Sequence, residues 1–152
     1  MSIFEGKRIF AIRGAVCSEN TKDDIFLNTE KLCREIFEKN KIKAEDLVSI
    51  QFSLTPDLNQ LNPATALRKG NTGLDTSKVA LFCCQEAVIE GMMEKVIRVM
   101  VTVYLDEKAK IFNIYQNGAE KLRPDFAKEY QEKKSEKESG ILEKLNSVEL
   151  AK

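Results

Sequence analysis

The most regular pattern in the chain is an alternation of apolar side chains over residues 96–105. Side chains two positions apart in a β-strand point to the same face of a sheet, so this alternation predicts a long central strand. The other face of this strand places Arg98 between Val96 and Met100, which is an unusual setting for a charged side chain. The apolar face consists of Ile97, Val99, Val101, Val103 and Leu105.

Shorter apolar or alternating runs predict further strands. These runs cover residues 8–13, 47–54, 78–84 and 111–115. We expect Gly14 to end the first strand and Thr55-Pro56-Asp57 to end the second. Since the run over 78–84 is apolar almost throughout, we expect that strand to be buried on both faces.

Two helices are predicted between the first three strands. Thr21 is a suitable N-cap for the first helix, which we expect to end near Asn40. Asn62 and Pro63 favour a second, short helix that ends by Gly70. Residues at helical spacing give the first helix one buried stripe, made of Ile25, Thr29, Leu32, Cys33, Ile36 and Phe37.

The composition changes near residue 126. Residues 126–152 contain six lysines and six glutamates and few apolar side chains. We therefore expect one domain over residues 1–126 and a charged C-terminal tail over 127–152, either helical or disordered. Within the domain, two helices are too few to cover both faces of a five-stranded sheet. One face is therefore expected to meet another subunit.

Charge and missing residue types narrow the possible chemistry. The 24 basic residues balance 24 acidic ones, and this zero net charge argues against nucleic-acid binding. The chain has no histidine, which excludes Ser-His-Asp and Cys-His nucleophile systems and His-ligated metal sites. Any chemistry must therefore use arginine, lysine, carboxylates, cysteine, tyrosine or backbone groups.

Several features favour a cytoplasmic protein. The spacing of the four cysteines fits no zinc or redox motif, so we expect reduced thiols. Residues 1–10 lack the apolar core of a signal peptide. No run approaches the ~18 apolar residues of a membrane span, and we expect no membrane partner.

Arginine is scarce, with six residues in the chain, and Arg98 is the first functional candidate. A guanidinium in this apolar setting needs an anion, which is either a ligand or a carboxylate in a structural salt bridge; an exposed sheet face is the further alternative. Arg13, at the end of an apolar strand, is a second functional candidate for a similar reason. Taken singly, Glu86, Arg68 and Tyr115 fit ordinary structural or solvated positions.

Taken together and in order, several short motifs resemble the trimeric, monofunctional chorismate mutases, the barrel-like class distinct from the all-helical one. The resemblance covers about residues 8–126, and the intervals between the motifs fit as well. The motifs are Ala11-Ile12-Arg13-Gly14-Ala15, Thr55-Pro56-Asp57-Leu58, Pro63-Ala64 with Arg68, Cys83, Gln85-Glu86, Lys95-Val96-Ile97-Arg98-Val99-Met100, Ile114-Tyr115 and Leu122-Arg123-Pro124-Asp125.

This resemblance implies an α+β subunit with a mixed β-sheet and helices on one face. It also implies a homotrimer in which the sheets form a pseudo-α/β-barrel, with active sites between subunits. The implied reaction is the Claisen rearrangement of chorismate to prephenate, on the route to phenylalanine and tyrosine. This reaction involves no proton transfer, no covalent intermediate, no cofactor and no metal. It requires orientation and positive charge, which suits a chain without histidine.

The resemblance also implies roles for individual residues. Arg98 would donate to the ether oxygen of the substrate, and Arg13 would hold the enolpyruvyl carboxylate with help from Tyr115. Glu86 would accept a hydrogen bond from the ring hydroxyl, with Cys83 beside it. The full set implied to bind substrate is Arg13, Arg68, Phe82, Cys83, Glu86, Arg98, Tyr115, Leu122 and Arg123.

Three positions depart from the family pattern. Asn62 replaces an aromatic residue, Thr65 a lysine and Phe82 a small polar residue. These departures concern the end of the site that binds the ring carboxylate, so they predict weaker binding rather than lost chemistry. Two alternatives remain: a non-catalytic trimeric module that binds carboxylate ligands, and a structural trimer in which Arg98 and Glu86 form a buried ion pair.

Overall fold

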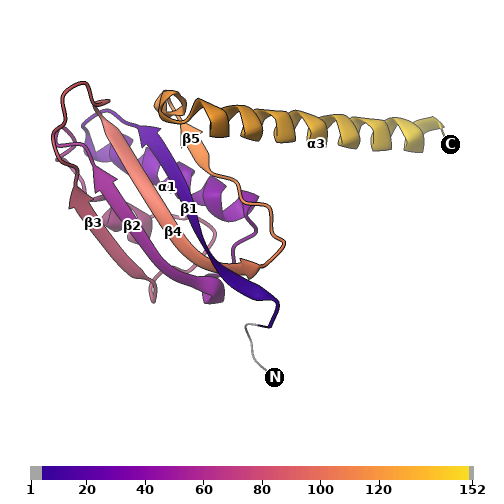
Figure 1. The fold of residues 1–152 in the computed structure, drawn as a ribbon, viewed down its shortest axis with the longest axis horizontal. Helices are drawn as coiled ribbons and strands as arrows, with labels where there is room; N and C mark the ends of the chain where they lie inside the picture. The colour runs from indigo at the N-terminus through magenta and orange to yellow at the C-terminus, as the bar shows by residue number, and fades with distance from the viewer. Residues whose placement is uncertain (1–4, 151–152) are drawn as a thin grey trace.

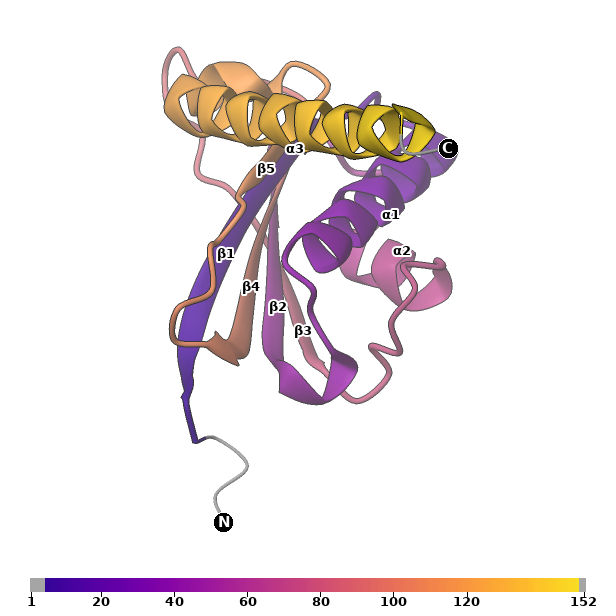
Figure 2. The ribbon, with the colours of Figure 1, turned by 90° about the vertical axis from the view of Figure 1, so that its right-hand side faces the viewer.

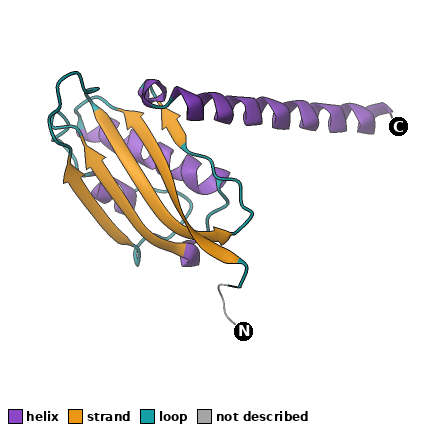
Figure 3. Cartoon of the chain, viewed as in Figure 1, coloured by secondary structure: helices purple, strands orange, loops and turns teal. Residues whose placement is uncertain are grey.

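The computed structural model describes residues 5–150 and shows a five-stranded sheet packed against helices (Figures 1 and 3). The strand order is β3-β2-β4-β1-β5, in which β4 is antiparallel to both neighbours and each edge strand is parallel to its neighbour. The predicted α+β fold with a mixed sheet is confirmed. The strands are β1 (Lys7–Cys17), β2 (Leu47–Leu54), β3 (Ala80–Gln85), β4 (Val96–Asp106) and β5 (Ile114–Gln116).

Helices α1 (Lys22–Lys39) and α2 (Pro63–Lys69) pack on the same face of the sheet (Figure 2). Neither covers the opposite face, which we call the open face and which bears Arg13, Arg98 and Met100. The prediction of helices on one face is thus confirmed. Two short 3₁₀ helices are also present, η1 (Ala44–Asp46) and η2 (Ala119–Leu122).

Both helices begin where the sequence predicts. The Thr21 hydroxyl accepts a hydrogen bond from the backbone N–H of Asp24 at 3.2 Å. The Asn62 side chain accepts one from the N–H of Ala64 at 2.8 Å. Each cap satisfies a donor that the first helical turn leaves unpaired, so each one fixes where its helix starts.

The hydrophobic core lies between the sheet and α1. The six residues of the predicted stripe on α1 are all buried. They meet the apolar face of the sheet, to which β4 contributes its alternate aliphatic side chains, as predicted. Burial of this kind of surface is the main source of stability for a domain of this size. The largest fully buried side chains include Phe52, Ile12, Ile25, Leu32, Ile36, Ile50 and Ile97.

The prediction that Gly14 ends the first strand is wrong, because β1 continues in register to Cys17. Gly14 instead lies opposite Val99, under α1 and beside β5. A Cβ atom there would come within 2.8 Å of Ile36 Cδ1 and 2.9 Å of the Ile114 carbonyl oxygen. The glycine therefore permits close packing of three elements rather than a turn.

The prediction that strand 78–84 is buried on both faces is also wrong. This segment forms β3, the edge strand beside β2. Its alternate side chains Phe82 and Cys84 are exposed, and Phe82 has a relative accessibility of 65%. An apolar edge strand is a surface that another chain can cover.

The C-terminal segment forms one long helix, α3 (Pro124–Leu150), which extends well beyond the sheet (Figure 1). Of the two forms expected for the tail, the structure has the helix. It begins at Pro124, before the expected start of the tail, and the last two residues lie outside the described part. No helix within residues 5–150 is both long and apolar enough to cross a membrane.

Candidate active site

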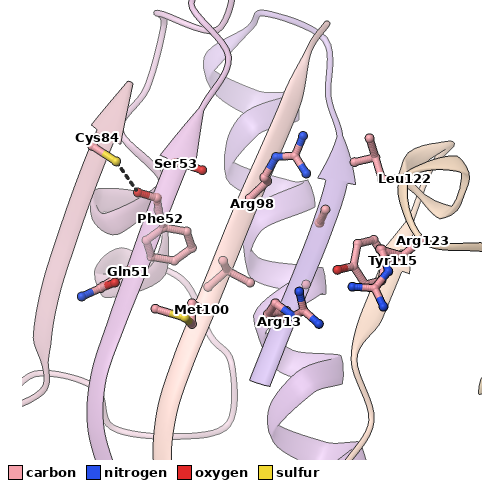
Figure 4. A pocket seen from close by; sticks show the side chains of 13 residues that line it. Arg13, Gln51, Phe52, Ser53, Cys84, Arg98, Met100, Tyr115, Leu122 and Arg123 are labelled. Carbon is pink, nitrogen blue, oxygen red and sulfur yellow. Dashed lines mark hydrogen bonds between the residues drawn. The ribbon is translucent and has the colours of Figure 1, made fainter. Parts of the chain in front are cut away.

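A cavity of about 460 Å³ lies on the open face, over β1, β2 and β4 (Figure 4). Its walls combine three arginines with aromatic, thioether and small side chains. Such a mixture of cationic and apolar groups is typical of a site for a small organic anion. The lining residues are Arg13, Gly14, Ala15, Gln51, Phe52, Ser53, Cys84, Arg98, Val99, Met100, Tyr115, Leu122 and Arg123.

Strand register brings the predicted residues together. Ala15 of β1 is paired with Arg98 of β4 on one side and with Tyr115 of β5 on the other. The methyl group of Ala15 is small, so a hollow remains between these two long side chains. Arg13 lies two residues along β1 and therefore points to the same face.

A charged hydrogen-bond cluster fixes Arg98. Its Nε donates to Oε1 of Glu86 at 2.7 Å, and the Ser53 hydroxyl donates to the same oxygen, also at 2.7 Å. The Glu86 backbone N–H donates to the Leu54 carbonyl oxygen at 2.8 Å, which anchors the loop after β3. The pair with Glu86 uses Nε, so within residues 5–150 the two terminal nitrogens of the guanidinium are available to a ligand.

The Arg98–Glu86 pair is partly open to solvent. The relative accessibility is 39% for the arginine side chain and 17% for the carboxylate. These values describe the single chain, in which the guanidinium faces the cavity. A ligand in the cavity of the single chain could therefore reach Arg98.

Arg123 lies at the other end of the cavity. It pairs in fork geometry with Asp125, with Nε to Oδ1 at 3.0 Å and Nη2 to Oδ2 at 2.7 Å. This hydrogen bonding lowers the pKa of Asp125 to about 2 and raises the pKa of Arg123. The carboxylate of Asp125 thus forms a bidentate pair with an arginine that lines the cavity.

Five of the predicted residues line this cavity: Arg13, Arg98, Tyr115, Leu122 and Arg123. Glu86 adjoins it through Arg98. Three predicted residues lie elsewhere. Arg68 is an exposed residue of α2 on the helical side, Phe82 is exposed on β3, and Cys83 packs against the core. Burial raises the pKa of the Cys83 thiol.

The structure adds site residues that sequence reasoning missed, namely Gln51, Ser53, Cys84 and Met100. Cys84 takes the cavity-facing position on β3, and its thiol lies 3.7 Å from the Phe52 carbonyl oxygen. Alternation along β2 could have indicated Ser53, since it follows the buried Phe52 and therefore points to the opposite face.

Comparison with known proteins identifies the family. The family model described as chorismate mutase type I matches residues 9–126. The chain belongs to the type I chorismate mutases. Chorismate mutase AroH of Bacillus subtilis is 37% identical over 121 residues, which cover 78% of this chain and 93% of the relative. The AroH enzyme of Thermus thermophilus is 32% identical over 118 residues, or 76% and 93% of the two chains.

A solved structure supports the same assignment. The chorismate mutase from Clostridium thermocellum superposes with a TM-score of 0.65 at 40% sequence identity, covering 73% of this chain and 97% of that one. Membership of this family of isomerases confirms the resemblance seen in the motifs. The matched region of the chorismate mutase model ends at residue 126, so most of α3 lies beyond it.

Proposed function

We propose that the cavity on the open face is where this chain rearranges chorismate to prephenate, and that Arg98 carries the reaction. The observation behind this proposal is the cluster of Ser53, Glu86 and Arg98. Two hydrogen bonds of 2.7 Å to one carboxylate oxygen fix a guanidinium that faces the cavity. A preorganised donor of this kind is what the rearrangement requires.

The chemistry of the step explains why arginine suffices. In the Claisen rearrangement one ether C–O bond breaks while one C–C bond forms within the same molecule, and no proton is transferred. Negative charge grows on the ether oxygen in the transition state. A terminal N–H of Arg98 would donate to that oxygen more strongly in the transition state than in the ground state, which lowers the barrier.

The remaining residues would bind and orient the substrate. Arg13 would hold the enolpyruvyl carboxylate, with the Tyr115 hydroxyl as a further donor. Glu86 would accept a hydrogen bond from the ring hydroxyl, and Arg123 would attract the ring carboxylate. Holding the flexible enolpyruvyl group over the ring converts binding energy into rate, because the reacting carbons must meet in one geometry.

We also propose that the working enzyme is a homotrimer whose cavities lie between subunits. Apolar side chains exposed on the open face support this proposal; Ile9, Phe82 and Met100 are 52%, 65% and 37% exposed. Arg68 and Phe82, which lie away from the cavity of their own chain, would then line the cavity of a neighbour. Light scattering tests this, and a monomeric mass would refute it.

A cytoplasmic location is the further part of this proposal. All four cysteines are free, and neighbouring Cys83 and Cys84 remain unpaired. Free thiols are expected where the cell keeps cysteine reduced.

The deciding experiment follows the ultraviolet absorbance of chorismate in the presence of the purified protein. We expect a loss above the uncatalysed rate, and we expect Arg98→Ala to lower kcat by about 100- to 1,000-fold, as for the removal of a transition-state donor. Arg8→Ala is the matched control, since Arg8 lies on β1 outside the cavity and packs on Phe10. Chorismate loss at the uncatalysed rate would favour the non-catalytic carboxylate-binding module.

A further inference from the structure

Phe126, in the first turn of α3, contacts three residues that line the cavity. Its ring centre lies 3.7 Å from Cζ of Arg123 and 5.2 Å from Cζ of Arg13. The ring of Tyr115 packs against it with 6.1 Å between centroids and an angle of 33°. Figure 4 shows these three partners together at one end of the cavity. Phe126 is not itself a lining residue, so it supports them from outside the cavity.

The Arg13 guanidinium lies over the Phe126 ring. Within residues 5–150 its guanidinium forms no ion pair within 4 Å, whereas Arg98 and Arg123 each pair with a carboxylate. A long arginine side chain without a partner samples many rotamers, and ordering it costs entropy when a ligand binds. The face of an aromatic ring attracts a guanidinium and reduces that freedom before binding.

Arg123 contacts the same ring. Its guanidinium stacks on Phe126 at the shorter of the two distances, while its nitrogens bind Asp125. Stacking leaves the edge of a guanidinium free for hydrogen bonds, and in Arg123 the edge formed by Nε and Nη2 binds Asp125. One ring therefore contacts both arginines at this end of the cavity.

We propose that Phe126 is a positioning residue for substrate binding, whose ring holds the guanidinium groups of Arg13 and Arg123 where they meet the carboxylates of the substrate. This inference rests on the proposed function, since it assigns both arginines to substrate carboxylates. Through Phe126, the first turn of α3 would contribute to substrate binding.

A positioning role of this kind affects KM rather than kcat. The substrate carboxylates are present in the ground state and in the transition state alike. Weaker positioning of Arg13 and Arg123 therefore raises KM and leaves kcat nearly unchanged. Loss of Arg98 has the opposite signature, because its donor acts on charge that develops during the reaction.

The test compares Phe126→Leu with Phe126→Tyr. Leucine keeps an apolar side chain but has no ring face, whereas tyrosine keeps the ring. We expect Phe126→Leu to raise KM by about 5- to 30-fold with kcat within about twofold of the wild type. We expect Phe126→Tyr to retain the wild-type KM. An unchanged KM in Phe126→Leu, or a fall in kcat alone, would overturn the proposal.

Phe112→Leu is the matched control. The Phe112 ring packs edge-on against Tyr130 of α3, with centroids 6.3 Å apart, and it does not line the cavity. This variant therefore loosens the contact of α3 with the domain and leaves the arginines alone. An equal rise in KM in Phe112→Leu would show that docking of α3 matters rather than the Phe126 ring, and it would also overturn the proposal.

A second readout does not depend on activity. The six arginine Nε–Hε groups of the unliganded protein can be followed by NMR, and ring currents from Phe126 displace the signals of those nearest to it. We expect Phe126→Leu to shift the Arg13 and Arg123 signals and leave that of Arg98 in place. Unshifted signals would refute the positioning role even in an active enzyme. Absence of turnover in the wild type would instead refute the proposed function, while the shifts still report on the ring.

Discussion

Ser53 and Arg98 face each other across the β2–β4 ladder and donate to the same oxygen of Glu86, each at 2.7 Å. The carboxylate that follows β3 is thereby held by two neighbouring strands. A shared acceptor couples the three side chains, because a shift of Glu86 would change the direction in which the Arg98 guanidinium points. The serine therefore supports the position of the Arg98 guanidinium through Glu86.

We expect Ser53→Ala to lower kcat/KM by about tenfold. The substitution removes a hydrogen bond to a charged group and frees Glu86, and with it Arg98, to sample other positions. Steady-state kinetics with chorismate measure the effect. Ser49→Ala is a control on the same strand and face, since Ser49 does not line the cavity. Equal kinetics in the two variants would contradict a supporting role for Ser53.

Gly14→Ala should destabilise the fold by about 1–3 kcal/mol, as expected for overpacking of a tight core position. The added methyl group would lie 2.8 Å from Ile36 Cδ1 and 2.9 Å from the backbone oxygen of Ile114, and the backbone atom has little room to move. Thermal or urea unfolding measures the loss. Gly140→Ala is the control, because a Cβ there meets no atom within 4 Å and alanine favours a helix. A wild-type stability for Gly14→Ala would show that the core relaxes around the methyl group.

Local signals in the sequence were enough to predict most elements. The alternation in β4 and the caps at Thr21 and Asn62 depend only on nearby residues, and the structure confirms them. The wrong predictions concern properties set by distant residues. A lone glycine after an apolar run predicts a strand end, whereas the packing role of Gly14 depends on Ile36 and Ile114, which are distant in sequence.

The predictions of site residues differ in the same way, according to whether nearby or distant residues decide them. Arg13, Arg98, Tyr115, Leu122 and Arg123 come together as the family motifs imply. On β3, the motif points to Cys83, but the pleat turns that side chain to the core and its neighbour Cys84 to the cavity. When a strand is expected to be buried on both faces, its sequence does not show which of two adjacent side chains faces the cavity. That depends on how the strand pairs with its neighbour.

Acid titration should reveal the Arg123–Asp125 pair. The pKa of Asp125 is lowered to about 2 by hydrogen bonding to Arg123, below the ordinary value of about 4. A depressed pKa in the folded state stabilises the protein above pH ~4, and the contribution is lost as the pH falls from about 4 to about 2. Carbon-13 NMR of the carboxyl group measures the pKa directly. We expect Arg123→Gln to return it to the ordinary range, and an unchanged low pKa in that variant would assign the shift to another cause.

Alkylation should separate the four thiols by their surroundings. Cys84 is exposed and lines the cavity, whereas complete burial raises the pKa of the Cys33 thiol to about 12 and burial also raises those of Cys17 and Cys83. Because the thiolate is the reactive form, we expect iodoacetamide to modify Cys84 first and Cys33 last.

The added group on Cys84 would occupy space in the cavity, so activity should fall in step with its modification and chorismate should slow both. Peptide mass spectrometry with parallel activity assays tests this, and Cys84→Ser should keep its activity under the same treatment. Inactivation of Cys84→Ser at the wild-type rate would show that another residue is the target. Protection by chorismate that vanishes in Arg13→Ala would, in turn, tie the thiol to the pocket in which the substrate carboxylate binds.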